Sequence, residues 1–180
     1  MENHFSKGSS FAFLGLSLAK RPNIAAAKIG MILGIFGTIL CLVFLAAVQR
    51  FLPIAQWGKS AASNLAELSQ VALFFVAVVF APVFETFVGQ VIPIEFARHF
   101  RANKFIGIIL GGTVFGLGHL LNGGVLHGLS AFIGGTVFSL GYVTFRQVGI
   151  CPAFIAAATA HAVQNATLLF VIAPLFPEIA

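Results

Sequence analysis

The chain carries very little charge. Only 8% of its 180 residues are Asp, Glu, Lys or Arg, whereas a soluble domain has about 25%. Hydrophobic residues make up 59%, and 19 glycines come in addition. A soluble fold of this size could not cover its surface with so few charged groups. A soluble enzyme, a nucleic-acid binder and a disordered chain are therefore disfavoured, and a polytopic membrane protein remains.

Cysteine is also scarce. Cys41 and Cys151 both lie in apolar stretches, so they indicate small buried residues rather than a disulfide or metal framework. The formal net charge of +5 does not indicate nucleic acid, because the basic residues lie at the ends of apolar runs, as membrane topology requires. No nucleic-acid partner is expected.

Five apolar runs are long enough to cross a bilayer, which takes about 20 residues of helix. The sequence predicts an all-α fold: a polytopic transmembrane helix bundle of about five spans, preceded by an N-terminal interfacial helix over residues 11–19. Residues 1–27 form a cytoplasmic or interfacial segment, and residues 28–180 form the membrane-embedded domain. The expected spans are 29–48, 65–96, 105–121, 125–145 and 152–173.

The basic residues predict the orientation. With a cytoplasmic N-terminus, eight of the ten Lys and Arg residues fall on the cytoplasmic side, and Arg50 and Lys59 fall outside. Cytoplasmic loops of membrane proteins carry such an excess. The chain is expected to be a multi-pass protein of the cell membrane, with the lipid bilayer as its surroundings and a bacterial inner membrane as its location.

Glu85, His119, His161 and Asn165 stand out among the polar residues of the predicted spans, because Glu85 is the only carboxylate well inside a span and Glu67 and Glu95 lie near span ends. Ionisable groups inside a membrane are costly and are functional candidates by default. At about 1.5 Å per residue of helix, they lie roughly 20, 22, 14 and 20 Å from the cytoplasmic end. Three different helices therefore offer polar groups at a similar depth. His127 is predicted to lie near the far surface and is interpreted as interfacial.

This set of residue types suits hydrolysis of an amide by direct attack of water. A buried carboxylate beside an imidazole can activate water, and a second His with an Asn can stabilise an oxyanion. No Asp lies inside a span, which excludes a pair of catalytic aspartates. Ser130 and Ser139 have no His at a fitting depth, and Cys151 is a weak candidate nucleophile.

Three short motifs follow one another on successive predicted helices. Phe115 to His119 reads Phe-x-x-x-His, His161 to Asn165 reads His-x-x-x-Asn, and both follow Glu85. In order and spacing the chain resembles the CPBP family of CAAX proteases and bacteriocin-processing enzymes, also called the Abi family. The resemblance covers about residues 65–173.

The resemblance implies an intramembrane endopeptidase acting on a peptide or membrane-protein substrate. In such proteins the first Glu and the histidine of the second motif are thought to activate water, which here are Glu85 and His119. The histidine and asparagine of the third motif are thought to form the oxyanion hole, which here are His161 and Asn165.

The first motif departs from the family pattern, Glu-Glu-x-x-x-Arg. Thr86 and Gln90 replace the second Glu and the Arg, and as an i, i+4 pair they are expected to face each other as a neutral pair that can still hydrogen-bond. Two alternatives stay open: a non-catalytic immunity or binding protein on the same scaffold, and a proton-coupled transporter, since Glu and His chains relay protons. Five spans, however, give no even inverted repeat.

No cofactor is expected. Glu85, His119 and His161 could together bind zinc, but the sequence has no His-Glu-x-x-His motif. The sequence therefore favours a site without metal.

Overall fold

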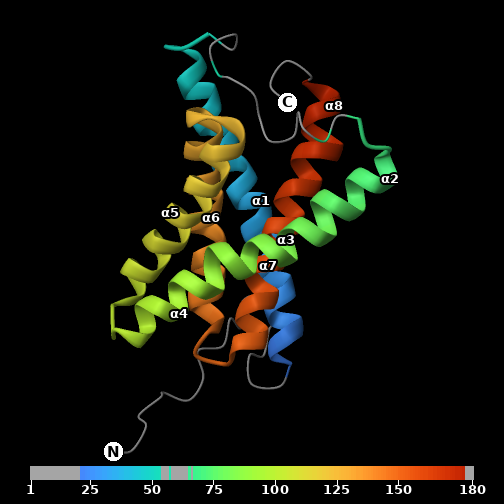
Figure 1. The fold of residues 1–180 in the computed structure, drawn as a ribbon. Helices are drawn as coiled ribbons and strands as arrows, with labels where there is room; N and C mark the ends of the chain where they lie inside the picture. The colour runs from blue at the N-terminus through green and yellow to red at the C-terminus, as the bar shows by residue number, and fades with distance from the viewer. Residues whose placement is uncertain (1–20, 54–56, 58–64, 66, 177–180) are drawn as a thin grey trace, which may run out of the picture.

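The computed structural model describes residues 21–53, 57, 65 and 67–176, and every regular element in these residues is helical (Figure 1). Five of its helices are long and apolar enough to cross a membrane, which confirms the predicted all-α bundle of five spans and makes this a membrane-embedded protein. The interfacial helix predicted over residues 11–19 lies outside the described residues. The spans are Pro22–Gln49, Gln70–His99, Lys104–Gly123, Val125–Phe145 and Ile150–Leu175.

The first span, α1 (Pro22–Gln49), begins about two turns before the predicted start at residue 29. Pro22 opens the helix, where its missing N–H costs nothing, and Lys28 lies exposed on the helix surface. The large apolar side chains of α1 point outward, while its buried face holds mostly Gly and Ala. That distribution is typical of a helix with lipid on one side and a closely packed helix on the other.

The second span is one 30-residue helix that changes its winding several times. Its segments are α2 (Gln70–Leu73), η4 (Phe74–Phe80), α3 (Ala81–Thr86), η5 (Phe87–Val91) and α4 (Ile92–His99).

The segments η4 and η5 are π-helical, and each ends two residues before a proline, Pro82 or Pro93. A proline has no N–H, and its ring crowds the carbonyl four residues earlier. Widening the preceding turn to i→i−5 hydrogen bonds relieves this conflict, so the helix accommodates Pro82 with a wide turn. Such π segments occur frequently at functional sites.

The remaining spans follow with short connections. They are α5 (Lys104–Gly123), α6 (Val125–Phe145) and α7 (Ile150–Thr167), which continues as η6 (Leu168–Ile172) and α8 (Ala173–Leu175). Gly124 alone separates α5 from α6 and has φ 90°, a value that favours glycine. A methyl group on Gly116 would lie 2.9 Å from the carbonyl oxygen of Gly128, so α5 and α6 are in backbone contact, as the glycine spacing of α5 predicts.

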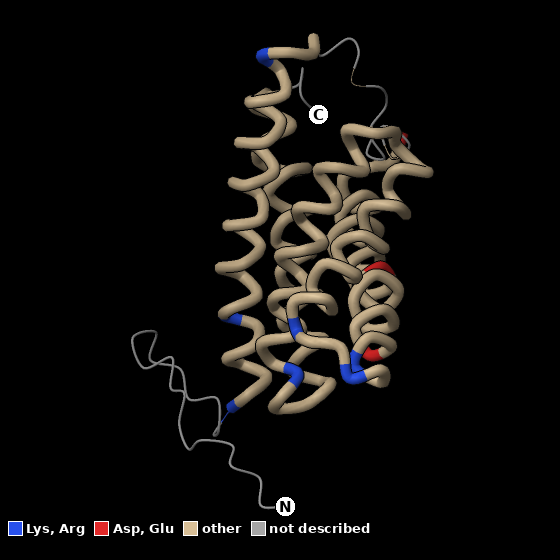
Figure 2. Tube along the Cα trace, turned by 90° about the vertical axis from the view of Figure 1, so that its left-hand side faces the viewer, with Lys and Arg blue, Asp and Glu red and all other residues tan. Residues whose placement is uncertain are grey.

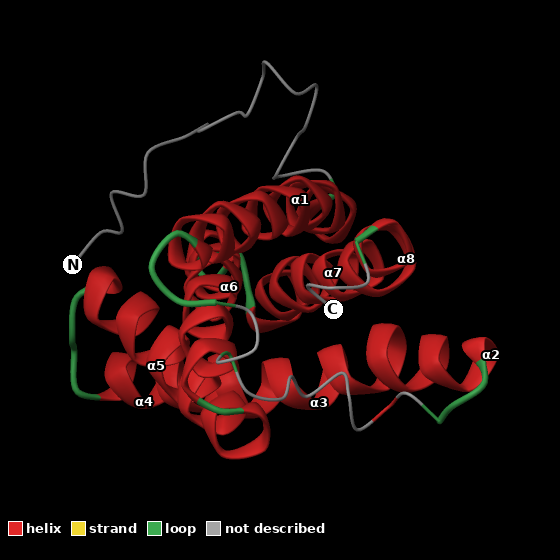
Figure 3. Cartoon of the chain, turned by 90° about the horizontal axis from the view of Figure 1, so that it is seen from above, coloured by secondary structure: helices red, strands yellow, loops and turns green. Residues whose placement is uncertain are grey.

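The helices form a bundle around α6 and α7. Seen from above, α7 lies between α1 and the Gln70–His99 helix, which runs steeply tilted across the bundle (Figures 1 and 3). Most of the Lys and Arg residues in the described chain gather at one end, where α1, α5 and α7 begin, and Arg50 lies at the other end (Figure 2). The charge asymmetry expected from the sequence is present, and the cytoplasmic N-terminus remains a prediction.

Candidate active site

Glu85 lies on α3 between two histidines from other helices. Its Oε2 atom is 3.6 Å from Nε2 of His119 on α5 and 3.6 Å from Nε2 of His161 on α7. These distances are slightly too long for direct hydrogen bonds, and a water molecule beside the three atoms can bridge them. The structure thus brings together three residues that are 34 to 76 positions apart in the chain.

His119 is oriented by its own helix. Its Nδ1 atom is 3.0 Å from the carbonyl oxygen of Phe115, one turn earlier. Because a carbonyl oxygen only accepts hydrogen bonds, Nδ1 carries the proton of the neutral ring and Nε2 is left as an acceptor. The ring of Phe115 stacks on that of His119 with centroids 4.4 Å apart. The Phe-x-x-x-His spacing therefore fixes the ring with its free lone pair towards Glu85.

His161 is the most buried member of the group, with 3% of its side chain exposed. Phe138 of α6 stacks on it with centroids 4.8 Å apart, and Phe115 meets it edge-on at 5.0 Å. Its Nδ1 atom is buried and has no hydrogen-bond partner in the described part of the chain, and Nε2, 3.6 Å from Glu85, is the atom that faces the site. Sequence reasoning missed Phe138, because nothing along the chain indicates which face of α6 meets α7.

Asn165 lies one turn beyond His161 and contacts the helix that carries Glu85. Its Nδ2 atom donates a hydrogen bond of 2.8 Å to the carbonyl oxygen of Ala77 in η4. In η4 each N–H bonds to the carbonyl five residues earlier, as the Ala81 N–H does to Val76. By the same pattern the carbonyl oxygen of Ala77 would accept the N–H of residue 82. Pro82 has no N–H to give, so the proline frees the carbonyl that Asn165 uses.

Thr86 and Gln90 do not form the hydrogen bond that their i, i+4 spacing would allow. Both side chains are fully buried, and their polar atoms have no hydrogen-bond partner in the described residues. The π-helical segment η5, which begins at Phe87, interrupts the α-helical i, i+4 register between them.

His127, interpreted as interfacial from the sequence, packs beside His119 in the structure. It is half-buried, and its ring centroid lies 5.2 Å from that of His119. The single-residue turn at Gly124 returns the chain so tightly that the start of α6 lies against the last turns of α5. The tight turn was the signal in the sequence that could have placed His127 beside the site.

A polar clamp away from the site holds α4 on α6. Glu95 accepts hydrogen bonds from the Arg146 guanidinium, one of them 2.9 Å long, and from the Tyr142 hydroxyl at 3.0 Å. These hydrogen bonds raise the pKa of Arg146 above its ordinary value. The clamp fixes the end of the tilted helix and therefore helps to set the position of Glu85 farther along it.

The site offers residue types that zinc accepts. Within the described part of the chain, however, no group of three or more His, Cys, Asp and Glu side chains is arranged to hold a metal ion. The expectation of a site without metal remains a prediction to be tested.

Comparison with known proteins identifies one family. A family model described as "Type II CAAX prenyl endopeptidase Rce1-like" matches residues 67–167, which hold the Glu85 segment and both histidine motifs. No curated protein and no solved structure matches the chain.

Proposed function

Because the chain belongs to the Rce1-like family of type II CAAX prenyl endopeptidases, we propose that it is an intramembrane endopeptidase that cleaves a peptide bond with an activated water molecule. One observation carries this proposal: a single carboxylate oxygen of Glu85 lies 3.6 Å from Nε2 of both His119 and His161. That geometry suits a water molecule held between the Glu85 carboxylate on α3 and Nε2 of His119 on α5.

In the proposed reaction, Glu85 and His119 hold and activate the water. The carboxylate oxygen and the unprotonated Nε2 of His119 each accept one hydrogen bond from it, which leaves a lone pair of the water oxygen to attack the scissile carbonyl carbon. As the new C–O bond forms, the proton leaving the water passes to Glu85. Glu85 then transfers that proton to the amide nitrogen, the C–N bond breaks, and a carboxylic acid and an amine leave.

His161 and Asn165 are the proposed donors to the oxyanion. The tautomer of His161 with its proton on Nε2 donates into the site, and Asn165 has a second amide N–H besides the one bonded to Ala77. Hydrogen-bond donors that face the developing negative charge stabilise the transition state more than the ground state. The roles follow the family resemblance, and the burial of His161 supports them by excluding competing water.

The proposed substrate is a peptide anchored in the membrane by an apolar group. Glu85 and His119 keep 34% and 21% of their side chains exposed, so the site is open on one side. The helices that carry Glu85 and His119 also expose large apolar side chains, with Phe84 58% and Leu117 54% exposed. A substrate arriving through such a surface needs apolar groups to match it.

The experiment uses the full chain reconstituted in liposomes with lipid-anchored peptides, prenylated and acylated. Glu85→Gln and His119→Ala are expected to lower kcat by about 10²–10⁴, the range for loss of general acid–base catalysis. His161→Ala and Asn165→Leu remove oxyanion donors, and each is expected to lower kcat by about 10²–10³.

Two matched controls make the same chemical changes outside the site. Glu67→Gln and His99→Ala replace residues near the ends of the second span and are expected to leave cleavage unchanged. If Glu85→Gln cleaves a verified substrate as fast as the wild-type protein does, the proposal is wrong.

A chelator tests the metal-free step separately. Cleavage is expected to continue at the same rate after treatment with EDTA or phenanthroline. Loss of activity that added zinc restores would contradict water activation by Glu85 and His119 alone, while leaving the chain a peptidase.

One observation favours a second candidate, a non-catalytic binding protein on the same scaffold. Thr86 and Gln90 replace two charged residues of the family motif and have no hydrogen-bond partner in the described residues. This alternative predicts that no lipid-anchored peptide is cleaved and that a binding or protective phenotype survives both Glu85→Gln and His119→Ala.

A further inference from the structure

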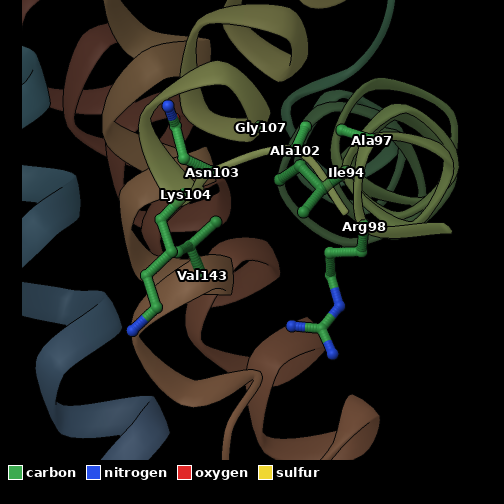
Figure 4. Close-up of a pocket in the computed structure, with 8 residues that line it drawn as sticks. All are labelled: Ile94, Ala97, Arg98, Ala102, Asn103, Lys104, Gly107 and Val143. Atoms are coloured by element: carbon green, nitrogen blue, oxygen red, sulfur yellow. The ribbon is translucent and has the colours of Figure 1, made fainter. Parts of the chain in front are cut away.

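We propose that a cavity at the cationic end of the bundle is a binding site for the phosphate headgroup of an anionic membrane lipid. The cavity lies where α4, α5 and α6 meet and has a volume of about 470 Å³ (Figure 4). This is within the range of roughly 300–1,000 Å³ for small-molecule sites in proteins. It is separate from the proposed catalytic group, none of whose residues lines it.

The lining divides into an apolar floor and a polar rim. The floor consists of Ile94, Ala97, Gly107 and Val143, which are buried. The rim consists of Arg98, Asn103 and Lys104, which are exposed. In Figure 4 the charged ends of Arg98 and Lys104 extend to the same side of the view, on either side of Val143. A group that carries both negative charge and apolar parts matches such a lining.

The rim has positive charge that no carboxylate of the lining balances. Glu95 is the nearest acidic partner of Arg98, at 3.6 Å, but it is bound more closely by the Arg146 guanidinium. Lys104 has no ion pair among the described residues, and the lining contains no Asp or Glu. Two cations are thus available to a phosphate group, which forms strong charge-assisted hydrogen bonds with both Arg and Lys.

Asn103 holds the α5 side of this rim in place. Its Oδ1 atom accepts the N–H of Ile106 at 2.9 Å and so caps the start of α5. In Figure 4 its amide nitrogen points to the side of the view opposite the charged ends of Arg98 and Lys104, so these two cations are the proposed phosphate ligands.

The location favours a lipid over a soluble phosphate. The cavity lies at the end of the bundle where most Lys and Arg residues gather (Figure 2), which is where a membrane protein meets phosphate headgroups. On the same two helices Phe96 of α4 and Phe105 of α5 are 62% and 69% exposed, so this end of the bundle also has apolar surface for acyl chains. Basic pockets between transmembrane helices bind anionic headgroups in this way.

The experiment measures lipid binding to the full chain in detergent by native mass spectrometry, with phosphatidylglycerol and phosphatidylcholine as probes. The wild-type protein is expected to retain phosphatidylglycerol preferentially. The double variant Arg98→Gln/Lys104→Gln is expected to lose affinity for phosphatidylglycerol by about thirtyfold, because it removes two direct charge-assisted contacts with the phosphate, each worth about 1 kcal/mol or more. Binding of phosphatidylcholine is expected to change little.

A matched control removes two cations from the same end of the bundle. Arg21→Gln/Lys28→Gln changes exposed residues at the start of α1 and makes the same difference in net charge. It is expected to leave the affinity within about twofold of wild type. Equal losses in the two double variants would show only a general surface attraction and would overturn the proposal.

A third variant blocks the cavity and keeps its charges. A methyl group on Gly107 would have only Ile94 within 4 Å, at 3.5 Å. The Gly107→Leu side chain therefore fits without displacing the backbone and extends into the cavity. It is expected to weaken phosphatidylglycerol binding at least tenfold with the circular dichroism spectrum unchanged. Unchanged binding in a folded Gly107→Leu protein would contradict the proposed site.

Two further arms separate the lipid from other anions. Inorganic phosphate and a soluble acidic peptide are each titrated as competitors. Neither is expected to displace phosphatidylglycerol at millimolar concentration, because neither contacts the apolar floor. Displacement by phosphate would assign the site to a free anion, and displacement by the peptide would assign it to a protein partner; either result overturns the lipid proposal.

Discussion

Replacing Gly34 with alanine puts a methyl group into the contact between α1 and α7. The added Cβ would lie 2.5 Å from the carbonyl oxygen of Ala160 and 2.8 Å from Cβ of Val163. The first neighbour is backbone and the second is a branched side chain at its root, so neither can rotate away. The two helices must separate by several tenths of an ångström along this contact.

The magnitude follows from two opposing effects. Alanine is a better helix former than glycine by about 0.5–1 kcal/mol, while overpacking a close contact costs about 1–3 kcal/mol. Gly34→Ala is therefore expected to lower the free energy of unfolding by about 1–2 kcal/mol. For a chain of this size, that lowers the midpoint of thermal unfolding by roughly 2–8 °C.

Gly118→Ala is the matched control, because it is the same change on a helix surface where nothing lies within 4 Å of the added methyl group. Only the helix-propensity effect acts there, and the midpoint is expected to rise by roughly 2–4 °C. The assay is circular dichroism of the detergent-solubilised protein during heating. Shifts of the same sign in both variants would refute the close contact of α1 with α7.

Three further predictions concern polar groups that lie between helices. Gln164→Met is expected to raise the free energy of unfolding by about 1 kcal/mol, because Gln164 is buried and its Oε1 has no hydrogen-bond partner among the described residues; chemical unfolding measures it. Glu95→Gln weakens the hydrogen bonds to Arg146 and is expected to lower the free energy of unfolding by about 1–3 kcal/mol. An unchanged free energy of unfolding would contradict a stabilising role of these bonds. Asn165→Leu is expected to lower the free energy of unfolding by about 1–2 kcal/mol. The loss is expected to be smaller in a Pro82→Ala background, because the restored N–H of residue 82 competes with Asn165 for the Ala77 carbonyl. A double-mutant cycle without coupling between the two positions would disprove this link.

The candidate site could be predicted in part because depth in a membrane can be counted along a helix. Each helical residue rises by about 1.5 Å, so the distances of Glu85, His119 and His161 from the cationic end follow from the positions of the flanking basic residues. The side chains do lie at a common depth, since one oxygen of Glu85 is 3.6 Å from both rings.

What could not be predicted depends on rotation and on local winding. Periodicity along α6 does not say which face meets α7, so the stacking of Phe138 on His161 was not foreseen. The change to π winding after Thr86 alters which side chains share a face, and this is why the expected pair with Gln90 is absent. The prolines that follow each π segment were visible in the sequence, but their effect on hydrogen-bond register was not.

The sequence by itself determined that this is a helical membrane protein with five spans, because apolar length and the scarcity of charge decide solvation residue by residue. It also indicated which few polar groups lie well inside the spans. Only the tertiary structure decided that His127 approaches His119, that Asn165 holds the carbonyl freed by Pro82, and that a cavity with a cationic rim opens between α4 and α5. These features depend on how helices are rotated and tilted against one another, and that is set by contacts among residues far apart in the chain.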